Sequence, residues 1–123
     1  MNKAYVGATL LGLAGCTAAG ASAINASDDL HCAIMIRTLE QNADELGATP
    51  VAKKGLYVLQ TWYFSKIKRE RLAEAQDVVE AMKENPGQIS SASQKCSNRA
   101  FGDPGFARWK SIASDEYDQK AMR

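Results

Sequence analysis

The sequence predicts an all-α protein, a small bundle of four to five short helices stapled by one disulfide bond. Apolar residues recur at steps of three and four along most of the chain, which is the spacing of one helical face. No run of β-branched residues alternates with period two, so signals for strands are absent. The 123 residues suffice for one domain, and a domain of this size often needs a covalent cross-link.

The first helix is expected over about residues 28–46. Ser27 is a suitable N-cap, and the two aspartates that follow it favour the positive end of the helix dipole. Gly47 is a natural stop. The apolar stripe of this helix consists of Cys32, Met35, Ile36, Leu39, Ala43 and Leu46.

The second helix begins at Thr49-Pro50, an N-cap followed by a proline in the first turn. Two adjoining faces are apolar, which predicts a central position in the bundle. Gly55 lies inside this helix at a cost of about 1 kcal/mol relative to alanine, and we interpret it as a mark of close helix packing. The two stripes are Ala52, Leu56, Leu59, Tyr63 and Ile67, and Val51, Val58 and Trp62.

A third helical segment covers about residues 69–84, with a stripe of Leu72, Ala75, Val79 and Met82. No glycine or proline separates it from the second, so both one long helix bent near residues 65–68 and two separate helices stay open. Asn85-Pro86-Gly87 is a firm stop.

The fourth helix is expected over about residues 88–101, and Asp103-Pro104 opens a short fifth helix with Asp103 as N-cap. The chain is polar from Ser114 onward. We therefore expect a helical domain over 28–114 and a frayed polar tail over 115–123. The inward residues are Ile89, Ala92, Cys96 and Ala100 in the fourth helix, and Phe106, Trp109, Ile112 and Ala113 in the fifth.

The N-terminus has the pattern of a secretory signal over residues 1–23. One basic residue, Lys3, precedes about ten apolar residues, and small residues follow. A membrane-spanning helix needs about 20 strongly apolar residues, and here the second half is rich in Ala, Gly, Ser and Thr. We therefore expect a cleaved signal and an exported protein.

The sequence Leu13-Ala14-Gly15-Cys16 resembles the lipobox of bacterial lipoproteins. The resemblance implies cleavage after residue 15, lipidation of Cys16, and a tether over residues 16–27. Ala21-Ser22-Ala23 is an alternative site for ordinary signal peptidase, with a mature start at Ile24. The protein is thus expected in the periplasm or anchored by lipid to a bacterial membrane.

Of the three cysteines, Cys16 is consumed by lipidation or removed by cleavage, which leaves Cys32 and Cys96. Two cysteines in an oxidising compartment usually pair. Both lie on the inward stripe of their helices. We predict a structural disulfide between them rather than a reactive or metal-binding pair.

Charge excludes some classes of function. The chain has 15 basic and 14 acidic residues, and removal of Lys3 with the signal leaves 14 against 14. A nucleic-acid-binding domain would show a basic excess. We expect no nucleic-acid partner, and contact with a membrane only through a lipid anchor if Cys16 is modified.

No arrangement of residues favours catalysis or a cofactor. The one histidine, His31, has no second ligand at metal-binding spacing and is expected on the surface. Pairs of acids alternate with Lys and Arg, which is typical of solvated helix faces. Glycine loops for phosphate and nucleophile motifs are absent. We predict no metal, no cofactor and no enzymatic activity.

One segment is dense in aromatic and basic residues: Trp62, Phe64, Lys66, Lys68, Arg69 and Arg71. Three consecutive aromatic residues on a helix cannot all face one core, so Phe64 is expected at a second interface or exposed. The segment is either a contact site for an anionic partner or a set of core aromatics followed by a solvated basic turn.

The sequence therefore predicts a non-enzymatic envelope or periplasmic protein that acts by binding an unidentified envelope component or as a structural part. The layout, with one cysteine in an early helix and one in a late helix, is similar to periplasmic acid-stress chaperones. That likeness implies a chaperone as the alternative function. An enzyme or enzyme inhibitor is a third and weaker alternative.

Overall fold

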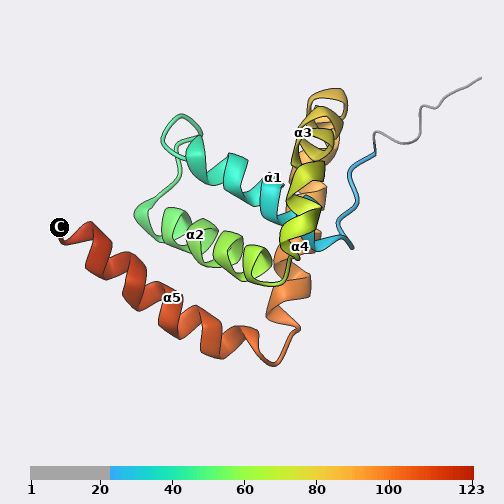
Figure 1. The fold of residues 1–123 in the computed structure, drawn as a ribbon. Coiled ribbons are helices and arrows are strands. Elements are labelled where there is room, and N and C mark those ends of the chain that lie inside the picture. Colours follow the sequence, from blue (N-terminus) through green and yellow to red (C-terminus); the bar gives the residue numbers. More distant parts are fainter. Residues whose placement is uncertain (1–22) are drawn as a thin grey trace, which may run out of the picture.

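The computed structural model describes residues 23–123, and the expected lipobox, Cys16 and the signal segment lie outside them. The described chain contains five α-helices and two 3-10 helices, with no strand (Figure 1). The predicted all-α class is confirmed. The helices are α1 (Asp29–Gln41), α2 (Pro50–Ser65), η2 (Arg69–Glu74), α3 (Ala75–Glu84), η3 (Pro86–Gln88), α4 (Ile89–Phe101) and α5 (Phe106–Ala121).

α1 begins one residue later than expected. Asp28, not Ser27, is the N-cap, and its side chain accepts a hydrogen bond from the Leu30 amide at 2.8 Å. The helix ends at Gln41, and Gly47 closes the following turns with a φ of 74°. Because the helix stops before Leu46, that side chain leaves the predicted stripe and is 63% exposed.

α2 begins as predicted, with the Thr49 hydroxyl accepting a hydrogen bond from the Ala52 amide at 3.1 Å. Its C-terminal half is central, since Val58 and Tyr63 are buried. Its first turn lies at the surface, where Val51 is 82% exposed. The second apolar stripe is therefore covered only from Val58 onward.

α2 ends at Ser65 and the next helical segment begins at Arg69, so residues 50–84 are not one long bent helix, which decides the alternative left open by the sequence. Six residues of η2 precede α3, and a 3-10 helix has about 3.0 residues per turn rather than 3.6. The change of period shifts the buried face. Val78, Ala81 and Met82 are buried, whereas Leu72, predicted to be in the stripe, is 44% exposed.

α4 places Ala92, Cys96 and Ala100 in the core as predicted. α5 is longer than predicted, because the expected tail 115–123 continues as helix to Ala121. Contacts with α2 hold it. The ring centroids of Tyr117 and Tyr57 are 5.3 Å apart, and the Lys54 ammonium pairs with Asp118 at 2.9 Å.

The helices pack around α1, which contacts α2, α3 and α4 (Figure 1). α5 runs antiparallel to α2 and covers its outer side, with the Trp109 indole N–H donating to the Thr61 hydroxyl at 3.1 Å. α2 and α4 do not form a closely packed pair. The core residues are Cys32, Ala33, Met35, Ile36, Val58, Tyr63, Met82, Ala92, Cys96, Ala100, Phe106 and Ala113.

The predicted disulfide between Cys32 and Cys96 is confirmed. The Cα atoms are 5.7 Å apart, a normal separation for a disulfide, and both side chains are fully buried. The bond joins the first turns of α1 to the middle of α4 across 64 residues of sequence.

We expect that replacing both Cys32 and Cys96 with alanine lowers the free energy of unfolding by about 4 kcal/mol, because the bond restricts the unfolded chain over a long loop. For a domain of this size that corresponds to a melting temperature lower by about 15 °C or more. Thermal unfolding followed by far-ultraviolet circular dichroism measures it. An unchanged melting temperature would contradict a stabilising role for the bond.

Candidate functional site

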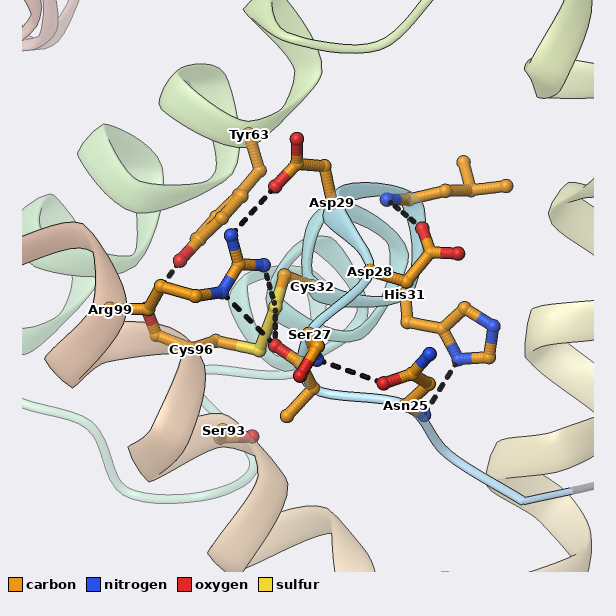
Figure 2. The surroundings of a disulfide bond; sticks show 12 residues. Asn25, Ser27, Asp28, Asp29, His31, Cys32, Tyr63, Ser93, Cys96 and Arg99 are labelled. Carbon is orange, nitrogen blue, oxygen red and sulfur yellow. Dashed lines mark hydrogen bonds and ion pairs between the residues drawn. A yellow bond between two sulfur atoms is a disulfide. The ribbon is translucent and has the colours of Figure 1, made fainter. Parts of the chain in front are cut away.

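Arg99 organises a polar cluster around the disulfide (Figure 2). Its guanidinium pairs with Asp29 at 2.9 Å and donates to the Ala26 carbonyl at 3.2 Å. A third contact reaches the Cys32 sulfur at 3.4 Å. Arg99 therefore ties α4 to the start of α1 and to the segment before it, alongside the covalent bond.

Tyr63 connects α2 to the same cluster. Its hydroxyl donates a hydrogen bond to the Cys96 carbonyl, and the Arg99 guanidinium lies 5.1 Å from the centre of its ring (Figure 2). Burial raises the pKa of Tyr63, so the phenol stays protonated and remains a donor. This hydrogen bond is a direct polar link between α2 and α4, which otherwise stand apart.

A second ion pair fixes η2 to α1. The Arg71 guanidinium binds both oxygens of Asp28, at 2.8 and 3.0 Å, and also Glu74 at 3.2 Å. Bidentate pairs of this kind are geometrically specific. The hydrogen bonds from Arg71 lower the pKa of the Asp28 carboxyl, which also caps α1.

An apolar groove lies along α2, where α4 does not cover it. It consists of two hollows. The outer hollow, of about 650 Å³, lies between α2, α4 and α5. The inner hollow, of about 630 Å³, lies between α1, α2 and α4. Leu56, Leu59 and Ser97 line both, so the hollows adjoin and form one groove, which we call the α2–α4 groove.

The outer hollow is lined mainly by carbon. Val51, Leu56, Val58 and Leu59 form its α2 side, and α4 and α5 add two phenylalanines, Phe101 and Phe106. Phe101 is 61% exposed, and its ring meets that of Phe106 edge-on at 5.3 Å between centroids. The hollow is thus an apolar surface open to solvent and bordered by two aromatic rings in contact.

Gly55 lines the outer hollow and leaves space there. A Cβ atom placed there would meet nothing within 4 Å. The interpretation of Gly55 as a site of close helix packing is therefore wrong. The missing side chain instead leaves space in the groove, at the usual cost of glycine to a helix.

The predicted aromatic–basic segment is divided among different contacts. Trp62 packs on Phe106 and Trp109 of α5, at 5.4 and 6.0 Å between ring centroids. Lys66 lies 4.6 Å above the Trp62 ring and pairs with Asp103 at 3.4 Å. Phe64 is half-buried, packs against the same core as Tyr63 and has Arg37 5.8 Å from its ring centre, so the expected second interface is not found.

The basic residues of this segment are likewise not gathered into one patch. Arg71 is engaged by Asp28 and Glu74, whereas Lys68 and Arg69 are exposed and form no ion pair within residues 23–123. The segment therefore presents two free cations rather than four.

His31 is half-buried rather than exposed. Its Nδ1 accepts a hydrogen bond from the Asn25 amide at 3.1 Å and so holds the segment before α1 (Figure 2). In the described part of the chain, no group of three or more His, Cys, Asp or Glu side chains is placed to hold a metal ion.

The residues that matter most to the groove were not singled out in the sequence. Lys110 and Phe101 received no role, Val51 was assigned to an apolar stripe expected to be covered, and Gly55 was assigned to close helix packing. A signal existed for one of them: Phe101 lies outside the apolar stripe of its helix. An apolar residue off the stripe indicates either a second interface or a binding surface.

Comparisons of the chain with protein families, with characterised proteins and with solved structures find no match. No helix within residues 23–123 combines the length and the apolar character needed to span a membrane.

The Asp28–Arg71 pair predicts a specific response to acid. Because the pKa of Asp28 is lowered on folding, the pair stabilises the protein above the unfolded-state pKa of about 3.9 and loses this contribution as pH falls through the lower folded value. Asp28→Asn keeps a capping oxygen and removes the charge. Between about pH 6 and about pH 3 we expect the wild type to lose about 1 kcal/mol more stability than this variant.

Urea unfolding at the two pH values measures the difference. Glu80→Gln is the matched control, because the pair of Glu80 with Lys83 is exposed and lies within one helix. Equal losses in the wild type and in Asp28→Asn would contradict the assignment.

Proposed function

We propose that this protein is a non-enzymatic binding protein and that the α2–α4 groove takes the apolar part of a small amphiphilic ligand. The observation that carries the proposal is the outer hollow, about 650 Å³ of open space with a lining mainly of apolar side chains. Small-molecule sites are usually concave, mostly apolar and about 300–1,000 Å³ in volume.

The distribution of exposed apolar side chains supports the groove as the site. Three of the large exposed hydrophobic residues, Leu46, Val51 and Phe101, line one or other hollow. Single exposed hydrophobic residues are common on protein surfaces, but their gathering around one concavity is typical of a binding site. A ligand chain in the groove would remove this surface from water at about 25 cal/mol per Å².

The walls of the groove are held before any ligand arrives. The disulfide, Arg99 and Tyr63 fix α4, while ring contacts and ion pairs fix α5 on α2. A preformed site loses less conformational entropy on binding. The groove therefore has the fixed shape that a small ligand requires.

The proposed setting is the bacterial envelope. The disulfide supports an exported protein, because such bonds persist in oxidising compartments. Export and lipidation of Cys16 stay predictions, since they concern residues outside the described chain. The acid-stress chaperone also stays a prediction; it requires that acid exposes apolar surface and that the protein then keeps a client soluble.

Filling the groove tests the proposal. Gly55→Leu places a side chain in the open space of the outer hollow, so we expect it to weaken binding of the uncharged fluorescent probe N-phenylnaphthylamine at least about tenfold. The fold should be retained, because leucine is the better helix former by up to about 1 kcal/mol. Fluorescence titration measures binding, and thermal unfolding measures stability.

Gly87→Leu is the matched control. Gly87 also has open space around its Cβ position, and it borders a different, smaller hollow. The proposal predicts that this variant binds the probe like the wild type. Unchanged binding in Gly55→Leu, or equal loss in both variants, would overturn it.

A further inference from the structure

We infer that the ligand of the α2–α4 groove is a single-chain amphiphile with a carboxylate headgroup, a fatty acid, and that Lys110 binds the carboxylate beside the outer hollow. The inference rests on the proposed function and adds the chemical class of the ligand. The inference depends on the charges of the residues that line the groove, on the absence of an ion pair at Lys110 within the described chain, and on the volume of the site.

The charges that line the groove are all positive. Lys54 and Lys110 border the outer hollow, and no Asp or Glu lines either hollow. The domain as a whole balances its charges, so a groove without acids departs from the average surface. An anionic headgroup is the complement of such a site, while a cationic one would find no acid among the residues that line it.

The two lysines are not equivalent. Lys54 is engaged, because its ammonium pairs with Asp118 at 2.9 Å. Lys110 forms no ion pair with any residue of the described chain, and its ammonium lies 5.7 Å from the centre of the exposed Phe101 ring. It is therefore the cation that is free to bind a ligand.

The position of Lys110 matches the two parts of an amphiphile. Its side chain and the Phe101 ring border the same hollow, so a ligand chain lying against that ring would carry its headgroup close to the ammonium. An ammonium and a carboxylate form a charge-assisted hydrogen bond. The apolar chain of a fatty acid would thus contact Phe101, and its carboxylate would contact the neighbouring Lys110.

A second copy of the chain is a weaker occupant. A twofold interface brings the same patch of both subunits together. An interface centred on the outer hollow would bring the two Lys110 side chains close together. The groove has no acidic residue to offset their charge. The volume of about 650 Å³ is likewise that of a small-molecule site rather than of an extended protein interface.

The experiment compares decanoate with decanol, which share a chain and differ in charge. Isothermal titration calorimetry of the protein with its disulfide formed is expected to give tighter binding of decanoate. Lys110→Gln should weaken decanoate about three- to fivefold, the size of an exposed ion pair, and leave decanol unchanged. Lys95→Gln is the matched control, because Lys95 lies on α4 and borders a different hollow.

The outcomes separate the two proposals. Equal affinity for decanoate and decanol, or no effect of Lys110→Gln on decanoate, overturns the carboxylate assignment. The groove remains supported as a binding site in that case if the fluorescent probe binds to the wild type and loses affinity in Gly55→Leu. Loss of both ligands in Lys95→Gln also overturns the role of Lys110. A protein that sediments as a dimer and dissociates in Gly55→Leu would identify a second copy as the occupant and overturn the fatty-acid assignment.

Discussion

The Cys32–Cys96 disulfide is the constraint on which the rest of the structure depends. It fixes α4 to α1 at Cα atoms 5.7 Å apart, and Arg99 and Tyr63 reinforce the same point. Because α4 is held in this way, it needs no extensive interface with α2 to keep its place. The space between α2 and α4 can remain open without loss of the fold, and the α2–α4 groove is the result.

The groove also shows how the small domain distributes its apolar surface. α5 covers one side of α2 through Trp62, Trp109 and Tyr57, whereas the side facing α4 is left partly bare. Exposed apolar surface weakens the driving force for folding, and glycine at position 55 adds a helix cost. The disulfide offsets both costs because it restricts the unfolded chain. A bound chain would recover part of the burial, so stability and ligand binding are coupled.

The sequence predicted the fold class, the disulfide and the caps of α2 because these depend on local or pairwise signals: helical spacing, Thr49-Pro50, and two cysteines on inward faces. It failed where tertiary contacts decide. The period change in η2 moved the buried face from Leu72 and Val79 to Val78 and Ala81. The segment after Ser114 is polar and was expected to fray, but Tyr117 and Asp118 contact α2 and hold it as part of α5. The groove could not be predicted, since it exists only in the relative placement of α2, α4 and α5.

The central claim is that the α2–α4 groove is a ligand site held open by the disulfide. The most direct measurement is an isotope-filtered nuclear Overhauser experiment on the oxidised, labelled protein with unlabelled decanoate. The account predicts cross-peaks from the ligand chain to Val58, Leu59 and Phe101, and their loss in the variant that lacks both Cys32 and Cys96. Cross-peaks confined to the exposed turn around Lys68 and Arg69, or unchanged cross-peaks without the disulfide, would contradict it.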